Sequence, residues 1–142
     1  MPHRFEGERT LMRIFIGESD RCPEGPYKGK HLYEALLHLF RERGFAGATV
    51  LRGIAGFGAS AKVHTDRILR LSLDLPIVVE VVDTEEKIEA VLPELDDMIG
   101  GGLITLERAH VILYRPADGD DGDDGGGGER SSRAADESGS EG

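Results

Sequence analysis

Residues 75–82 read LPIVVEVV, and residues 84–99 continue as TEEKIEAVLPELDDMI. The first stretch is almost entirely apolar and rich in β-branched residues, which is typical of a buried strand. In the second stretch, Thr84 has the chemistry of a helix N-cap, and two glutamates follow where the helix dipole favours negative charge. We therefore expect a strand followed directly by an amphipathic helix. The apolar stripe of this helix consists of Ile88, Val91, Leu92, Leu95, Met98 and Ile99.

Shorter patterns on either side complete the order of elements. An apolar run at residues 11–16 is ended by Gly17, and Gly53 inside a second run indicates a bulge or a close backbone approach. Gly44 stands where a glycine ends a helix. The expected strands are residues 11–16, 48–55, 75–82 and 103–114, the last broken around Glu107 and Arg108, and the expected helices are residues 31–43 and 84–99.

This order, β-α-β-β-α-β, predicts an α+β domain of the ferredoxin-like class, with two helices on one face of an antiparallel sheet. Residues 56–73 are read as a long excursion between the second and third strands, with a helical turn near residues 66–71. We expect a short N-terminal extension at residues 1–9 and the folded domain at residues 10–116.

Residues 117–142 consist mainly of Asp, Gly, Ser and Glu, and we expect them to form a disordered acidic tail. Nine acids against two arginines give this tail a net charge of −7, out of −10 for the chain of 142 residues. The nearly balanced remainder gives no general attraction to nucleic acid or anionic lipid. Without an apolar leader or a span of about 20 apolar residues, the chain is expected to be cytoplasmic.

The third expected strand is apolar on both sides. Ile77, Val79 and Val81 point one way, while Val78 and Val82 accompany a single glutamate on the other side. A sheet face with this lining would form a large exposed apolar patch, so we expect a second copy of the chain to cover it. The alternative is that a loop or the excursion at residues 56–73 folds over the sheet.

Two stretches are candidate parts of a binding site. The residues that follow the first strand predict a polar pocket rim or, equally, a charged turn that caps the sheet; they are Glu18, Ser19, Asp20 and Arg21. Gly100, Gly101 and Gly102 predict either a turn that presents backbone N–H groups to an anion, with a positive φ in one of them, or a simple helix stop. No catalytic constellation and no metal site are predicted, and the cofactor is left open.

Several phrases resemble known families. Residues 47–50 and 56–58 are similar to the second strand and the T-loop entrance of the PII signal-transduction proteins, and residues 79–91 to their third strand and second helix. More narrowly, the phrases IGESD at residues 16–20 and LRGIAGFG at residues 51–58 resemble domain of unknown function 190, an uncharacterised branch of the PII-like superfamily.

The resemblance implies a homotrimer with small-ligand clefts between subunits and a flexible loop that docks on a partner such as a membrane transporter or an enzyme. Thr49, Gly56 and Gly58 would line the cleft, and the three glycines at residues 100–102 would meet a nucleotide or another anion. PII proteins have a lysine after these glycines and two phosphate-binding arginines on the next strand. Here the corresponding residues are Leu103-Ile104, Val111 and Leu113, so Arg52 or Arg108 would have to supply the charge.

Two other functions suit the same fold. One is a trimer similar to CutA that binds metal or serves a structural role. The other is a hydrolase similar to acylphosphatase, whose chemistry needs an asparagine to hold water; this chain has no asparagine.

Overall fold

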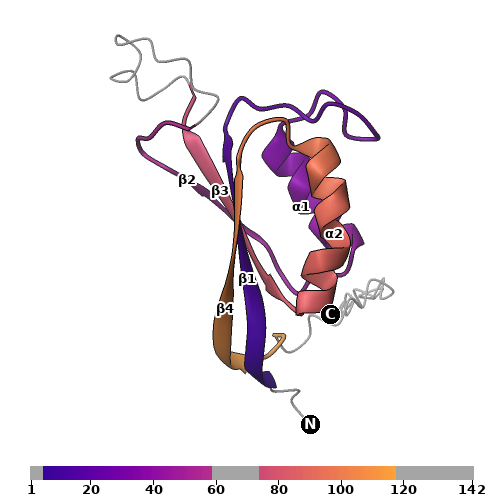
Figure 1. The fold of residues 1–142 in the computed structure, drawn as a ribbon, viewed down its shortest axis with the longest axis vertical. Coiled ribbons are helices and arrows are strands. Elements are labelled where there is room, and N and C mark those ends of the chain that lie inside the picture. Colours follow the sequence, from indigo (N-terminus) through magenta and orange to yellow (C-terminus); the bar gives the residue numbers. More distant parts are fainter. Residues whose placement is uncertain (1–4, 59–73, 118–142) are drawn as a thin grey trace, which may run out of the picture.

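The computed structural model describes residues 5–58 and 74–117, which form a four-stranded antiparallel sheet with two helices on one face (Figure 1). The order of strands across the sheet is β2-β3-β1-β4. The predicted ferredoxin-like arrangement is therefore confirmed. The elements are β1 (Phe5–Gly17), α1 (Leu32–Glu42), β2 (Thr49–Arg52), β3 (Pro76–Asp83), α2 (Glu85–Met98) and β4 (Leu103–Tyr114).

The hydrophobic core lies between the sheet and the helix layer. Alternate residues of β1 and β3 point into it because successive side chains of a strand project to opposite faces. Helix α1 contributes a wide apolar face, and α2 the narrower stripe that its sequence predicts. The fully or almost fully buried members are Met12, Ile14, Ile16, Leu32, Leu36, Leu39, Phe40, Ile77, Val79, Val81, Ile88, Val91 and Leu95.

The ends of the helices follow the local signals of the sequence. Thr84 is the N-cap of α2, and its Oγ1 accepts a hydrogen bond from the backbone N–H of Lys87 at 3.2 Å. At the end of α1, Gly44 has φ +74°, a left-handed conformation that glycine adopts at little cost. These caps set the points at which the chain turns back toward the sheet.

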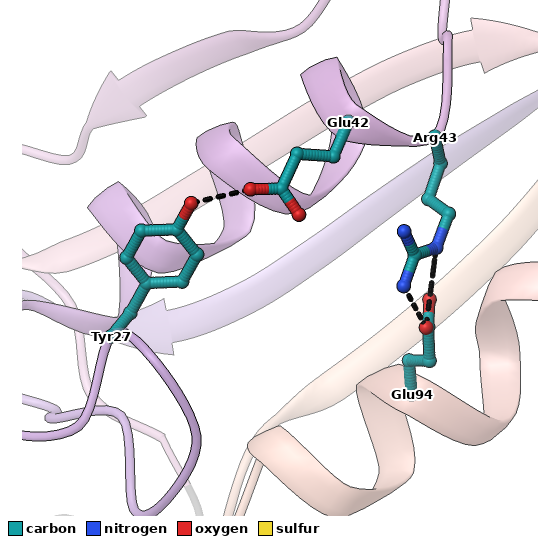
Figure 2. Close-up of polar contacts among 4 residues, drawn as sticks. All are labelled: Tyr27, Glu42, Arg43 and Glu94. Carbon is teal, nitrogen blue, oxygen red and sulfur yellow. Dashed lines mark hydrogen bonds and ion pairs between the residues drawn. The ribbon is translucent and has the colours of Figure 1, made fainter.

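Polar contacts on the outside of α1 tie it to its surroundings (Figure 2). Arg43 forms a two-pronged ion pair with Glu94 of α2, in which Nε lies 2.9 Å from Oε2. The hydrogen bond from Arg43 lowers the pKa of Glu94, and the same bond raises the pKa of Arg43. Tyr27 donates its hydroxyl hydrogen to Glu42 at 2.5 Å, which raises the pKa of Tyr27.

Two strands differ from their predicted lengths. β1 begins at Phe5, inside the predicted N-terminal extension, because it continues to pair with β4 beyond the end of β3. β2 ends at Arg52, where Gly53 closely approaches Pro76: an added Cβ would lie 2.6 Å from the proline Cγ. The predicted close approach at Gly53 is thus confirmed, although the strand stops before it.

The expected break in β4 is wrong. Glu107 and Arg108 pair in register with Leu11 and Thr10 of β1, and the strand is continuous. Their charged side chains do not interrupt the ladder, because backbone groups form its hydrogen bonds. The helical turn expected near residues 66–71, most of the excursion and the acidic tail from residue 118 lie outside the described residues.

Candidate functional site

One end of the sheet brings together most of the residues predicted to bind a ligand. β1 ends there at Gly17, β2 at Arg52, and β3 begins there at Pro76. The register pairs Gly17 with Pro76 and Arg52 with Ile77. The connection from α2 to β4 reaches the same end, which lies uppermost in Figure 1. Three connections, β1 to α1, β2 to β3 and α2 to β4, therefore converge at this end of the sheet.

An ion pair joins the two predicted groups at this end. Arg52 Nη2 lies 2.5 Å from Oε1 of Glu18, the first residue of the predicted rim. The backbone N–H of Glu18 donates to the carbonyl of Leu75 at 2.8 Å, which fixes this residue beside the start of β3. Arg52 remains more than half exposed, so its guanidinium can contact both Glu18 and a ligand in solvent.

The other rim residues hold the turn that follows β1. Asp20 Oδ2 accepts from the backbone N–H of Gly17 at 2.9 Å, and the N–H of Ser19 donates to Asp74 Oδ1 at 3.0 Å. Arg21 Nη1 donates to the carbonyl of Gly29 at 3.3 Å. These bonds give Ser19, Asp20 and Arg21 a structural role in the charged turn, whereas Glu18 is the rim residue that meets a predicted ligand-binding residue.

The glycines after α2 have a different local geometry from the one expected. Positive φ angles among the described glycines occur at residues 7, 25, 29, 44 and 56, and at none of residues 100–102. The expected positive φ in this turn is therefore wrong. Close packing explains the glycine at residue 102, since an added Cβ would lie 2.6 Å from the carbonyl oxygen of Phe15. At Gly100 an added Cβ would meet nothing within 4 Å.

The predicted ligand-binding residues lie on opposite edges of the sheet. Arg52 ends β2, while Gly101 and Gly102 precede β4, and two strands separate these edges. Three strand spacings of roughly 4.8 Å place them about 14 Å apart. Gly56 follows β2 but lies against β3, since an added Cβ would be 3.1 Å from the Cγ of Pro76. Thr49 lies at the opposite end of β2, paired with Glu80, and an added Cβ at Gly58 would meet nothing within 4 Å.

The sheet face without helices has a regular pattern of rows across the strands. The first row is apolar and crosses all four strands as Leu51, Val78, Phe15 and Leu103. The next row is Thr49, Glu80, Arg13 and Thr105. The two faces predicted for the third strand are confirmed, because Ile77, Val79 and Val81 are buried on the helix side.

An ionic triad lies at the centre of this face. Arg13 Nε donates to Glu80 Oε1 at 3.0 Å, and its Nη1 donates to Glu107 Oε1 at 2.9 Å. The hydrogen bond to Glu80 is the main cause that raises the pKa of Arg13. The sequence interpretation missed this triad because it placed a strand break at Glu107; a continuous last strand would have aligned Glu107 beside Arg13.

Neither a metal-ligand cluster nor a membrane-spanning helix occurs among the described residues. Within residues 5–58 and 74–117, no three His, Cys, Asp or Glu side chains gather into a group that could hold a metal ion. None of the helices in those ranges is long and apolar enough to cross a membrane.

Comparison with known proteins identifies the family. Residues 9–111 match the family DUF190, described as uncharacterized ACR. The chain belongs to the DUF190 family. A UPF0166 protein of Aquifex aeolicus (strain VF5) is 41% identical over 105 residues, which cover 74% of this chain and 94% of the relative. A UPF0166 protein of Methanocaldococcus jannaschii is 36% identical over 102 residues, covering 71% and 89%. The family predicted from residues 16–20 and 51–58 is thus confirmed.

Among solved structures, CPII from Thiomonas intermedia K12, bound to ADP and bicarbonate, aligns with a TM-score of 0.44 and 17% sequence identity. The alignment covers 80% of this DUF190 chain and 100% of the CPII chain.

Proposed function

We propose that this DUF190 protein is a PII-like regulatory protein without catalytic activity. It assembles as a homotrimer, binds a small anionic ligand such as a nucleotide in the clefts between subunits, and passes its ligand state to a partner such as a membrane transporter or an enzyme. The acidic tail after residue 117 takes no part in folding or assembly. The resemblance to PII proteins and the arrangement of residues at the loop end of the sheet support this proposal.

The observation that carries the proposal is the separation of the ligand-binding residues within one chain. Arg52 lies at the end of β2 and Gly102 at the start of β4, and three strand spacings put about 14 Å between these two edges of the sheet. A phosphate or carboxylate group is too small to bridge that distance through direct hydrogen bonds. A ring of copies that sets the β2 edge of one subunit beside the β4 edge of the next would bring both groups to one ligand.

The face without helices supports assembly. Phe15, Leu51 and Leu103 are 36%, 48% and 56% exposed, and they belong to one continuous row. An apolar row of this kind is stable in water when a partner surface covers it. The ionic triad around Arg13 lies directly beside the row, so a second subunit must match both an apolar and a charged stripe. Such a mixed surface favours one specific partner geometry over general aggregation.

The test combines assembly with ligand binding. We expect light scattering to give three times the chain mass at micromolar concentration, and a panel of nucleotides and small anions to contain at least one that raises Tm. A ligand at about 100 times its Kd stabilises a protein by roughly 2.7 kcal/mol. Arg52→Gln should weaken the binding of that ligand measured by calorimetry, whereas Arg41→Gln on the exposed side of α1 should not.

A monomer at these concentrations contradicts the assembly. A trimer whose Tm responds to no member of the panel contradicts the ligand-binding role. If Arg52→Gln and Arg41→Gln bind the ligand equally well, the ligand does not use the loop end of the sheet.

A further inference from the structure

A large cavity lies at the other end of the sheet, beside the part of β1 that extends past β3. Its volume is about 840 Å³. β3 accompanies β1 only as far as the pair Thr10–Asp83. Before Thr10, β1 is paired with β4 alone among the described strands, and Phe5 and Arg9 of this ribbon line the cavity. The ribbon projects well beyond the helix layer in Figure 1.

The walls of this cavity are mainly apolar. Val82 of β3 and Leu113 and Tyr114 of β4 line it, and they are 37%, 49% and 44% exposed. Small-molecule sites in proteins are cavities of about 300–1,000 Å³ with apolar walls and a few polar groups. The volume of this cavity lies within that range, and its lining has the same mixture of apolar and polar groups. The acidic tail is a poor occupant by composition, since residues 118–142 contain no apolar side chain larger than that of alanine.

Two cations add a charged subsite to these walls. The Arg9 guanidinium lies 3.6 Å from the centroid of the Phe5 ring, a cation–π contact that holds it at the wall. Lys87 Nζ donates to the carbonyl of Gly44 at 2.6 Å. Both cations keep donors for a further acceptor, since an arginine has five N–H donors and a lysine has three.

One carboxylate also lines the cavity, and the backbone already binds it. Asp83 is the buried charged residue of the described core, with 6% exposure. Its Oδ2 accepts from the N–H of Ala46 at 2.9 Å and its Oδ1 from the N–H of Thr84 at 2.8 Å, while Lys87 lies 3.8 Å from Oδ1. The charged side chains lining the cavity therefore sum to one positive charge in a chain whose net charge is −10.

We infer that this cavity binds a small organic anion with an apolar body, and that Arg9 and Lys87 bind its acidic group. The body of the ligand packs against Val82, Leu113 and Tyr114. The inference goes beyond the proposed function, because within one chain this cavity is at the opposite end of the sheet from Arg52 and Glu18. Part of this cavity lies outside the segment that matches the family, since Phe5, Leu113 and Tyr114 fall outside residues 9–111.

The test uses two fluorescent probes of nearly the same shape on the full-length protein. Anilinonaphthalene sulfonate carries a negative charge, and N-phenylnaphthylamine is its neutral counterpart. We expect saturable binding of the sulfonate. Arg9→Gln and Lys87→Gln should each lower the affinity for the sulfonate by about tenfold, because each removes one charged contact. The affinity for the neutral probe should stay within about twofold of its original value.

The control variants separate charge from structure. Lys28→Gln, in an exposed loop, should leave the affinity for both probes unchanged, and Leu113→Asp should weaken both by placing a carboxylate in the apolar wall. Because Lys87→Gln removes a contact to Gly44, Lys87→Arg serves as the charge-retaining variant and should recover the sulfonate affinity. Circular dichroism and light scattering verify that each variant keeps its fold and assembly.

Three results would overturn the inference. The first is the absence of saturable sulfonate binding to the original protein. The second is sulfonate affinity that does not change in Arg9→Gln and Lys87→Gln. The third is an equal loss of affinity for both probes in these two variants, which would show that Arg9 and Lys87 have only a structural role.

Discussion

The two faces of the sheet are built from the same strands but have different chemistry. On the helix side, the side chains of β1 at Met12, Ile14 and Ile16 are all apolar and at most 6% exposed. On the other side, the residues between them include Arg13, paired with two glutamates, and Phe15, which is 36% exposed. The helices of the chain itself complete the first face. The second face carries an apolar row and a charged row, and no helix of the described chain covers them.

This difference indicates what each face is for. An apolar interior accepts many packings of similar volume, so it stabilises a fold without selecting a partner. A charged group beside an apolar row makes binding unfavourable for any partner surface that buries the charge without pairing it. The triad of Arg13, Glu80 and Glu107 therefore favours one alignment of an approaching surface, and the apolar row beside it supplies the area to be buried.

The sharpest test compares neighbours on β1 that point to opposite faces. Ile14→Ala removes a fully buried side chain from the core and should lower the free energy of unfolding by about 2–5 kcal/mol. Phe15→Ala should instead shift the assembly toward monomer. Urea unfolding and light scattering at several protein concentrations measure the two effects. Equal effects of both variants on unfolding and assembly would remove the distinction between the faces.

A second pair of variants tests the turn at the rim of the sheet. Gly102→Ala forces a Cβ to within 2.6 Å of the Phe15 carbonyl oxygen, and overpacking of this kind costs about 1–3 kcal/mol. Gly100→Ala enters open space and should change stability by no more than roughly 0.5 kcal/mol. Thermal unfolding compares them. If Gly102→Ala is as stable as the original protein, the turn and the strand can separate at no cost.

The charged row of the open face gives a third test. Arg13→Gln leaves Glu80 and Glu107 without their shared cation. We expect the concentration for half-dissociation of the proposed trimer to rise by roughly tenfold, because the two carboxylates would be left unpaired at the interface. Dilution followed by mass photometry measures this shift. Arg41→Gln is the control, and an equal response of both variants would show that the interface does not include the triad.

The smallest expected effect concerns the helix layer. Glu94→Gln weakens the ion pair with Arg43, and because both side chains are more than a third exposed, Tm should fall by a few degrees at most. The pKa of Glu94 is lowered in the folded protein from its ordinary value of 4.5. Its contribution is therefore complete above the pKa of the unfolded chain and is lost as pH falls through the folded value.

The difference in Tm between Glu94→Gln and the original protein should thus vanish in acid. Glu89→Gln, an exposed change on the same helix, serves as the control. A difference that persists unchanged at pH values below the folded pKa would indicate that Glu94 acts through packing and not through its charge.

Local patterns predicted the elements, and they failed where pairing is not local. Both helices and the buried sides of β1 and β3 follow from spacing and capping, because these depend on neighbours in the chain. Glu107 and Arg108 suggested a break because charged residues are rare in short apolar strands. Their pairing with Leu11 and Thr10 nevertheless keeps the strand intact. That register depends on residues almost 100 positions away, which no local pattern contains.

The candidate site divides in the same way. The phrases around Glu18 and Arg52 indicated a rim and a ligand-binding strand end, but not that one ion pair joins them. Arg9 and Lys87 drew no attention, because a lone arginine before a strand and a lysine on a helix are common surface residues. Gly102 suggested an anion-binding turn, and no local pattern indicated that it also lies close to β1, where an added Cβ would be 2.6 Å from the Phe15 carbonyl oxygen.

By itself, then, the sequence of this DUF190 protein determined the order of the strands and helices, which sides of them are buried, and the family. These features depend on interactions between residues close together in the chain and on the spacing of apolar side chains, and both can be read from the sequence pattern. The tertiary structure decided which charged residues meet. Arg13 with Glu80 and Glu107, Arg52 with Glu18, and Arg9 and Lys87 around one cavity all depend on strand register and on the length of a projecting ribbon. Register is set by pairing across the whole sheet, so the chemistry of this molecule becomes visible only when all four strands are in place.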